Sequence, residues 1–377
     1  MKKKISALML LTVLCTILVS CISQSRNSNV KQPKAKQSFV RFENISVFTP
    51  YEDIRFKSFN DDINLSYEDI RTLTFNRLTV WNVENTKKAE EILTTYTNPG
   101  LGVCDLHKKG ITGQGVVTAI IDQNLAGEHP EFKGKLKGYY DLGCDMSPDE
   151  GSMHGPAVAS LLVGNNIGTA PGSSVYYFAV PSWKRDSKYY ADALTMIIEM
   201  NSKMEKDSDK IRVVSVSAAP SGDGSPCEKN NELWDEAVKK AMDANILVLD
   251  CTSNKFGFVS PGYYDPDAPE DLELFKSGWP NREVRETPEN YVCAPCSYRT
   301  KAEEYVKNEF SYQYSGVGGL SWGIPYAAGV CALGWQVNPD LTAQEMKELL
   351  LKSAYTTSAK VRVINPAGLI NMIESAN

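Results

Sequence analysis

The sequence has 377 residues, of which 42% are hydrophobic and 23% are charged. This balance supports a large core, in one big domain or two modest ones, and excludes a disordered chain. The formal net charge of -6 argues against nucleic acid as the main partner, because phosphate binding needs a basic surface.

The first 21 residues are expected to form an export signal. Lysines occupy positions 2–4, and the apolar run at 5–19 is too short to span a bilayer comfortably. The run ends in Leu-Val-Ser-Cys, which resembles the lipobox of bacterial lipoproteins, in which the cysteine is lipidated and becomes the new N-terminus. We therefore expect a membrane lipid anchor at Cys21, facing the extracytoplasmic side, with an ordinary cleaved signal as the alternative. Residues 22–37 are polar and basic, which indicates a tether.

Residues 38–105 carry mixed signals and no motif with obvious chemistry. Alternating residues at 39–48 suggest strands, and residues 85–96 have the pattern of a short amphipathic helix. We expect an N-terminal extension here, either structural or propeptide-like.

Seven cysteines remain outside the signal and the expected lipid site, so disulfides cannot use them all. Cys293 and Cys296 have the C-x-x-C spacing of a redox pair or half a zinc site. The sequence contains no second C-x-x-C that would complete a four-sulfur site. We therefore expect neither metal nor redox function at this pair.

Strand patterns alternate with helix patterns from about Gly110 onward. The expected strands cover residues 116–121, 175–180, 212–217 and 246–249, and the expected helices cover 158–163, 189–200, 232–242 and 342–353. Thr342 and Glu345 form a capping box at the start of the last helix. The alternation predicts an α/β fold with a doubly wound, mostly parallel sheet, helices on both faces and a preceding N-terminal extension.

Asp122 directly follows the apolar run at 116–121. Parallel sheets bind ligands at the carboxyl ends of their strands, so this carboxylate is expected at the functional edge of the sheet. A solvated strand end or a helix cap is the alternative.

The chain has three histidines that could serve as an imidazole base, His107, His129 and His154. We expect His107, in a polar and lysine-flanked stretch, to be solvated. His129 precedes a proline in a loop, where a positioning role is the better interpretation. His154 precedes small residues that open a helix and leave room around the ring.

A serine, Ser321, lies in the glycine-rich stretch 318–329, ahead of an apolar run. The glycines would let the backbone turn sharply and approach a ligand. The G-x-S-x-G pattern also matches the nucleophile elbow of α/β-hydrolases. Those enzymes place the histidine after the serine, whereas every histidine here precedes Ser321, so that interpretation fails on chain order.

The chain order Asp122, His154, Ser321 is that of the subtilisin triad. The surrounding motifs resemble the subtilase family of serine proteases (S8), from about Gly110 to Ala354. In this chain, Gly110-Ile-Thr-Gly-Gln-Gly-Val is similar to the family's approach to its aspartate, and His154-Gly155 with Val158-Ala159 resembles the family's histidine motif. The fixed residues of the family's serine motif match Gly319, Ser321, Pro325, Ala328 and Gly329.

The resemblance implies a serine endopeptidase that cleaves protein or peptide substrates through an acyl-enzyme. Ser321 would be the nucleophile, His154 the general base and Asp122 the residue that orients the imidazole. The family also implies an oxyanion donor at Asn254, and a substrate-lining strand and loop at Ser217, Ala218, Ala219 and Pro220. Residues 106–377 would be the catalytic domain and residues 38–105 an extension or propeptide. No cofactor is expected; calcium often supports the fold, but the sequence shows no compact ligand cluster.

This chain departs from the family pattern at several positions near the expected site. Gln123-Asn124 replaces a small hydroxyl residue and glycine, although an asparagine tolerates the left-handed backbone of such a turn. The other replacements are Ala157 for a second histidine, Ala218 and Ala219 for glycines, Cys296 for a glycine, and Trp322, Gly323, Ile324 and Tyr326 for smaller, more uniform residues. These departures keep two other functions open, a catalytically silent binding or scaffold module and an esterase or amidase.

Overall fold

A computed structural model describes residues 43–60, 62–145, 150–253 and 255–376. These residues belong to one compact unit that begins at Phe42. The expected signal, Cys21, the tether and Asn254 lie outside the described residues. Among the described helices, none is long and apolar enough to cross a membrane.

The centre of the fold is a five-stranded parallel sheet with the strand order β5-β6-β4-β7-β8. Its strands are β4 (Val117–Asp122), β5 (Leu136–Asp141), β6 (Ser174–Ala179), β7 (Ile211–Val216) and β8 (Leu247–Asp250). Residues of β4 are buried throughout, which agrees with the continuous apolar run in the sequence. Asp122 is the last residue of β4 and lies at the carboxyl edge of the sheet.

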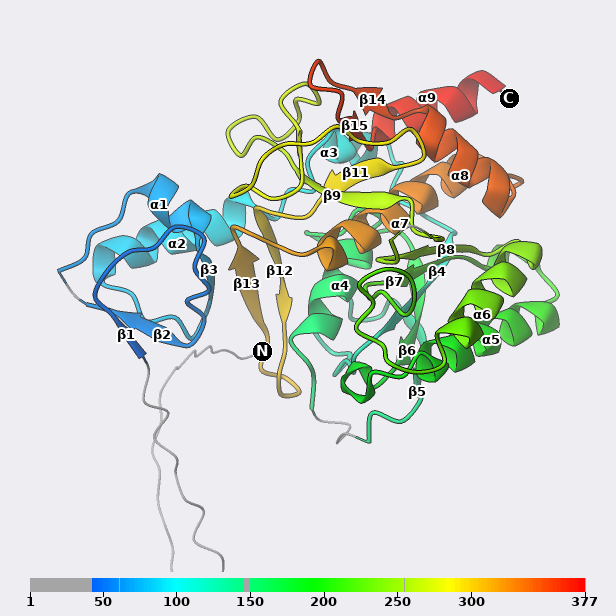
Figure 1. The fold of residues 1–377 in the computed structure, drawn as a ribbon, viewed down its shortest axis with the longest axis horizontal. Coiled ribbons are helices and arrows are strands. Elements are labelled where there is room, and N and C mark those ends of the chain that lie inside the picture. The colour runs from blue at the N-terminus through cyan, green and yellow to red at the C-terminus, as the bar shows by residue number, and fades with distance from the viewer. Residues whose placement is uncertain (1–42, 61, 146–149, 254, 377) are drawn as a thin grey trace, which may run out of the picture. The chain divides into compact units, whose positions relative to one another are not determined.

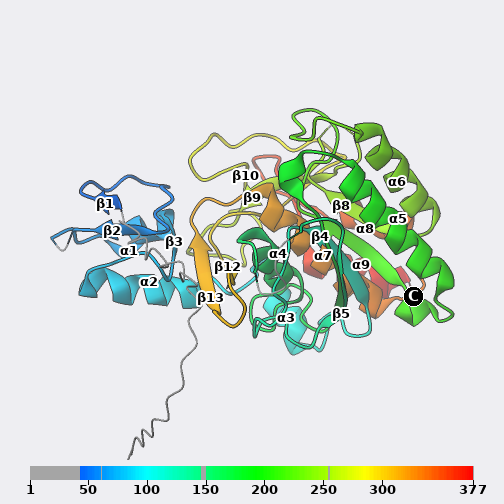
Figure 2. The same ribbon diagram turned by 90° about the horizontal axis from the view of Figure 1, so that it is seen from below.

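Helices cover both faces of this sheet, as the sequence predicted (Figures 1 and 2). One face packs against α5 (Lys188–Lys203) and α6 (Asn231–Asp243) through Ala119 and Ile121 of β4. Ile120 points the other way, because side chains alternate along a strand, and belongs to the larger core, which includes residues of four helices later in the chain. These are α4 (His154–Val163), α7 (Leu320–Val337), α8 (Ala343–Lys352) and α9 (Pro366–Ala376).

A second sheet packs against α7, and a hairpin packs against α4. The second sheet has the order β10-β9-β11-β15-β14, with β9 (Val259–Tyr263), β10 (Lys276–Ser277), β11 (Val292–Pro295), β14 (Tyr355–Thr356) and β15 (Arg362–Val363). The hairpin consists of β12 (Arg299–Glu303) and β13 (Ser311–Ser315), which pair antiparallel. Short 3₁₀ helices occupy Ser182–Lys184 and Asp207–Asp209.

The N-terminal segment, defined here as residues 43–100, is joined to that hairpin. It contains β1 (Glu43–Ile45), β2 (Lys57–Phe59), α1 (Tyr67–Thr72), β3 (Thr74–Asn76) and α2 (Val83–Thr95), and α3 (Val103–Lys108) follows it. Strand β3 pairs antiparallel with β13, which makes a three-stranded sheet in the order β12-β13-β3. The segment therefore shares a sheet and a hydrophobic core with the rest of the unit.

Strand β12 is completely buried although every second residue is charged. Arg299, Lys301 and Glu303 are all 0% exposed. The Lys301 ammonium donates to the Ser315 hydroxyl and lies 4.6 Å from the centre of the Trp322 ring. Burial, reinforced by the nearby charge of Arg55, lowers the pKa of Lys301 from 10.5 to about 7.

This lowered pKa makes stability depend on pH. Between pH 7 and pH 10.5 the unfolded chain holds a proton on Lys301 that the folded chain has lost, so the free energy of unfolding rises with pH. Below pH 7 both states are protonated, and the cost of burying the charge is fully present. A Lys301→Met variant lacks this contribution.

We expect the stability of the wild type relative to Lys301→Met to increase by about 2 kcal/mol between pH 7 and pH 9. Denaturant unfolding of both proteins at the two pH values measures the change. Identical pH dependence of the two proteins would contradict the assignment.

Candidate active site

Ser321 is the second residue of α7, and its position depends on a close approach of the preceding loop to β11. A Cβ atom on Gly318 would lie 1.7 Å from the carbonyl oxygen of Cys296, so only glycine fits at this position of the loop. Gly319 is the N-cap residue, and its carbonyl accepts a hydrogen bond from the main-chain N–H of Trp322 at 2.9 Å. The half-buried Ser321 side chain therefore stands at a helix N-terminus, where main-chain N–H groups lack intrahelical partners.

Ser217 fastens this turn to the end of β7. The Ser217 hydroxyl donates to the carbonyl oxygen of Ser321 at 2.8 Å, and the Ser321 hydroxyl donates to the carbonyl oxygen of Ser217 at 3.2 Å. This reciprocal pair fixes the turn that bears Ser321 at the carboxyl edge of the central sheet. The Ser321 hydroxyl thus has a main-chain acceptor in this structure, and rotation about χ1 would redirect it.

Asp122 and His154 are hydrogen-bonded to each other. The Oδ1 atom of Asp122 lies 2.6 Å from Nδ1 of His154 and also accepts the main-chain N–H of Gln123 at 2.8 Å. Asp122 is only 4% exposed, whereas the His154 side chain is 19% exposed. A proton on Nδ1 satisfies this bond and leaves Nε2 as the basic nitrogen. The sequence order thus brings this carboxylate and this imidazole together at one edge of the sheet.

The start of α4 needs glycine directly after His154. A Cβ atom on Gly155 would lie 2.5 Å from the carbonyl oxygen of Asn124 and 2.7 Å from the Tyr177 hydroxyl. That hydroxyl donates to the carbonyl oxygen of Gln123 at 2.5 Å. The helix therefore packs directly onto the turn that follows Asp122, which fixes the imidazole against the carboxylate.

The turn after Asp122 forms differently from the expectation. Asn124 is not among the residues with positive φ, so its tolerance of a left-handed backbone is not used. Its buried side-chain NH₂ instead donates to the carbonyl oxygen of Glu150 at 2.6 Å, and its main-chain carbonyl accepts the Ser152 hydroxyl at 3.0 Å. A side-chain hydrogen bond holds the turn in place of a glycine.

Trp322 connects the serine helix to the histidine. Its ring centre lies 5.1 Å from that of His154, the two planes are tilted by 35°, and only 7% of the residue is exposed. Lys301 lies against the same indole. Ile324 and Tyr326, the other large residues near the serine, are fully buried in the core. Of these three departures from the family pattern, Trp322 is the one that contacts the imidazole.

The remaining predicted site residues follow β7 and β8. The carbonyl of Ala218 accepts the main-chain N–H of Cys251 at 2.9 Å, that of Ala219 accepts the Ser225 hydroxyl at 2.7 Å, and that of Pro220 accepts the Ser187 hydroxyl at 2.5 Å. Ala218 and Ala219 are partly exposed, whereas Pro220 is buried. These hydrogen bonds fix the main chain of residues 218–220 beside the end of β8.

Asp250 organises the chain that leads toward Asn254. Its carboxylate accepts hydrogen bonds from the Trp234 indole at 2.9 Å and from the Thr252 main chain and hydroxyl at 3.0 and 2.7 Å. Burial raises the pKa of Asp250, although these hydrogen bonds oppose the change. Sequence reasoning missed this role; an acidic residue ending an apolar strand was the available signal.

The other two histidines have structural partners. His129 is fully buried, with Nε2 2.9 Å from the carbonyl oxygen of Ser311, in agreement with a positioning role. The expectation that His107 is solvated is wrong, because its Nε2 lies 2.9 Å from the carbonyl oxygen of Thr169 and burial lowers its pKa. Packing of α3 against the core explains the difference.

The cysteines show no sign of a metal or redox centre in the described part of the chain. All seven described cysteines are free thiols, and no group of three or more described histidine, cysteine or acidic side chains is arranged to hold a metal ion. Cys296 is buried beside α7, where a Cβ atom on Gly323 would lie 2.8 Å from its sulfur. Burial raises the pKa of the Cys296 thiol to about 12, so it remains a protonated packing residue.

Comparison with known proteins gives sequence relatives and structural neighbours. Serine protease AprX of Bacillus subtilis (strain 168) is 25% identical over 301 residues, covering 69% of this chain and 66% of its own. Subtilisin-like protease PopC of Myxococcus xanthus (strain DK1622) is 24% identical over 285 residues, covering 67% of this chain and 58% of its own. The chain thus spans less than two thirds of the length of these curated relatives.

Two solved structures support the fold. The prenylagaramide maturation protease PagA has a TM-score of 0.53 at 19% identity, covering 72% of this chain and 98% of its own. Fervidolysin from Fervidobacterium pennivorans has a TM-score of 0.54 at 14% identity, covering 75% of this chain and 46% of its own. Residues 113–369 match the Subtilase family, and the chain therefore belongs to the subtilase family of serine peptidases.

Proposed function

We propose that this chain is a serine endopeptidase that uses Ser321, His154 and Asp122 as its triad. The observation that carries the proposal is the 2.6 Å contact between Asp122 Oδ1 and His154 Nδ1. Trp322, the residue after Ser321, has its ring centre 5.1 Å from that of His154, which supports a position of Ser321 near the imidazole. Membership of the subtilase family supports the same chemistry. Protein or peptide chains are the proposed substrates.

The proposed reaction begins when the Ser321 hydroxyl turns from the Ser217 carbonyl toward His154. Its oxygen attacks the scissile carbonyl carbon while Nε2 of His154 takes the proton. Asp122 stabilises the imidazolium that forms. The imidazolium then protonates the departing amine, which leaves an acyl-enzyme on Ser321. Water deprotonated by the same imidazole releases the second product.

The negative charge of the tetrahedral intermediate needs hydrogen-bond donors. The main-chain N–H of Ser321, in the first turn of α7, is one proposed donor. The side chain of Asn254 is the other, assigned from the sequence. Support for that assignment comes from Asp250 and Thr252, whose hydrogen bonds fix the chain shortly before Asn254.

We also propose that the enzyme works outside the cytoplasm, held on a membrane by a lipid at Cys21. The basic start, the short apolar run and the lipobox-like Leu-Val-Ser-Cys support this location.

The reaction needs no metal, since the triad and the oxyanion donors supply the acid, base and electrostatic groups.

Replacing Ser321 with alanine is expected to abolish turnover without unfolding the chain. The loss should be about 10⁶-fold in kcat, because the triad acts as a unit, whereas one partly exposed hydroxyl contributes about 1 kcal/mol to stability. Casein hydrolysis and a fluorophosphonate label mapped to its peptide provide the measurement. Ser202→Ala, on the exposed side of α5, is the control.

Undiminished proteolysis by Ser321→Ala would refute the nucleophile assignment. Wild type that folds but neither cleaves casein nor reacts with the fluorophosphonate would instead indicate the silent binding module. Turnover of small esters without casein would indicate an esterase.

Replacing Asn254 with alanine is expected to lower kcat about 10²–10³-fold with little change in KM. The removed amide acts on charge that develops only in the transition state. Steady-state kinetics on a peptide substrate measures both constants. An unchanged kcat in Asn254→Ala would contradict the donor role.

Trp322 is expected to hold the His154 ring in place for proton transfer. Trp322→Ala removes the indole that packs on the imidazole, and we expect kcat to fall about tenfold because small misplacements of catalytic groups are costly. Trp322→Phe keeps an aromatic face and should retain most of the activity. Wild-type kcat in the alanine variant would rule this role out.

A further inference from the structure

The N-terminal segment, residues 43–100, is bound to the hairpin by main-chain hydrogen bonds as well as by side chains. The carbonyl oxygen of Leu73 accepts the main-chain N–H of Gly316 at 2.9 Å, and the carbonyl oxygen of Tyr96 accepts the main-chain N–H of Thr300 at 2.9 Å. A Cβ atom on Gly316 would lie 2.0 Å from the carbonyl oxygen of Thr72, so the segment approaches the end of β13 too closely for any residue other than glycine at position 316. The segment is therefore fitted to the hairpin as an additional strand.

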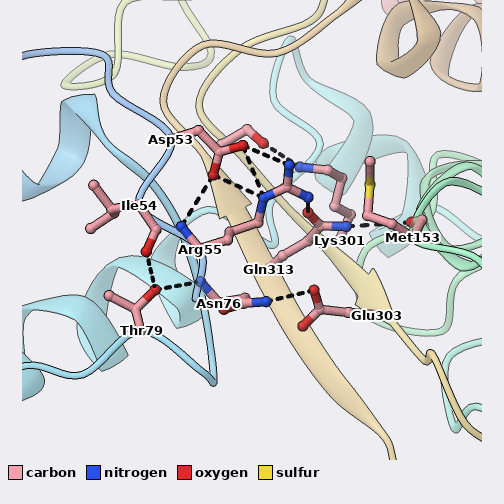
Figure 3. Close-up of polar contacts among 10 residues, drawn as sticks. Asp53, Ile54, Arg55, Asn76, Thr79, Met153, Lys301, Glu303 and Gln313 are labelled. Atoms are coloured by element: carbon pink, nitrogen blue, oxygen red, sulfur yellow. Dashed lines mark hydrogen bonds and ion pairs between the residues drawn. The ribbon is translucent and has the colours of Figure 1, made fainter. Parts of the chain in front are cut away.

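The segment also satisfies buried polar groups of the hairpin (Figure 3). The Asn76 amide donates to the Glu303 carboxylate at 2.8 Å, and both residues are almost completely buried. Arg55 pairs with Asp53 through Nε and Nη2, and its Nη1 donates to Oε1 of Gln313 at 3.1 Å. Without the segment, Oε1 of Glu303 and Oε1 of Gln313 would lose these donors, and the loss of a hydrogen bond at a buried acceptor is costly. Oε2 of Glu303 would keep the Ser311 hydroxyl.

Gln313 carries this contact to the histidine helix. Its Nε2 donates to the carbonyl oxygen of Met153 at 3.4 Å, and Gln313 is 1% exposed. Met153 is the N-cap residue of α4, and His154 is the next residue. Figure 3 shows Gln313 between Arg55 and Met153, so a line of hydrogen bonds runs from the segment to the main chain that bears the imidazole.

The connection from the segment to β4 follows α7 away from its catalytic end. The Tyr326 hydroxyl donates to the carbonyl oxygen of Gly100 at 3.2 Å, and Leu101 and Val103 are buried. Farther along, the side-chain oxygen of Gln336 accepts three consecutive main-chain N–H groups, those of Thr112, Gly113 and Gln114. This connection therefore packs on turns of α7 beyond the one that bears Ser321.

We infer that the N-terminal segment stays in the active enzyme and that Arg55, acting through Gln313, is a positioning residue for His154. The segment behaves as part of the scaffold: it completes a sheet, gives the buried Glu303 carboxylate a hydrogen-bond donor and braces the start of α4. The kinetic part of this inference rests on the proposed peptidase function.

Retention is tested on the full chain after reaction with a biotinylated fluorophosphonate. Intact mass and N-terminal sequencing of the labelled molecules should show that residues 43–100 are still attached. Labelled molecules that begin beyond residue 100 would overturn retention and leave the peptidase function standing. Unreacted full-length molecules beside labelled shorter ones would likewise overturn retention. A sample in which neither full-length nor shorter molecules react would overturn the peptidase function, and with it the claim that the segment stays in an active enzyme.

Positioning is tested with Arg55→Ala and Gln313→Met. The first removes the guanidinium, and the second deletes both Gln313 hydrogen bonds without changing charge. Each should lower kcat about tenfold with KM within about twofold of wild type, because the imidazole is displaced while substrate contacts persist. Arg77→Ala is the matched control, since it removes an exposed ion pair of the same segment with Glu309 and should leave kcat unchanged.

The kinetics are measured well below the unfolding temperature of each variant, so that a loss of stability alone does not change kcat. Wild-type kcat in both variants would overturn the positioning role. A loss in Arg55→Ala without a loss in Gln313→Met would overturn the route through Gln313. If Arg55→Ala does not fold, Gln313→Met alone decides, by its kcat.

Discussion

The burial of α7 is the constraint on which the rest of the structure depends. Every residue from Trp322 to Trp335 is buried, and the helix contacts β7 of the central sheet as well as β9 and β11 of the second sheet. Its close neighbours require glycine at several points, for example at Gly329, where a Cβ atom would lie 2.5 Å from Thr169. Ser321 stands at the end of this rigid core helix, so its position follows from packing.

The second constraint is electrostatic and lies in the hairpin. A strand that buries Arg299, Lys301 and Glu303 would be unfavourable on apolar contacts alone, because buried charges need partners. The Asn76 amide of the N-terminal segment donates to the glutamate, and the Lys301 ammonium donates to the Ser315 hydroxyl of the hairpin itself. The lysine also lies against Trp322, which packs on His154. The buried polar contacts of the hairpin and the placement of the imidazole are thus parts of one contiguous contact set.

Much of the fold could be predicted from the sequence because the central part has local signals. The apolar run before Asp122 became β4, and the small residues after His154 became α4, although that helix begins four residues earlier than its apolar pattern indicated. The capping box at Thr342 formed as expected. The strand before Asp122, the helix after His154 and the family motifs together predicted this carboxylate and this imidazole as partners, and the two are hydrogen-bonded.

The hairpin and its third strand could not be predicted, because their signals are not local. Alternating charges on β12 are typical of an exposed strand. Strand β12 is nevertheless buried, in a sheet that also contains β3, which pairs with β13 and is far from it in the sequence. The expectation that His107 is solvated failed for the same reason, since its hydrogen-bond partner Thr169 is distant in the chain. Long-range partners, which a single sequence does not reveal, decided both cases.

The status of the N-terminal segment determines how a lipid anchor and an active peptidase can coexist. If residues 43–100 were a propeptide removed by cleavage, maturation would separate the catalytic part from any lipid at Cys21. A segment that completes the hairpin sheet and donates a hydrogen bond to its buried glutamate belongs to the folded scaffold, and its removal would break these contacts. The proposed anchor and the proposed catalysis are then compatible in one continuous chain, because the residues inferred to brace the histidine helix lie between Cys21 and the triad.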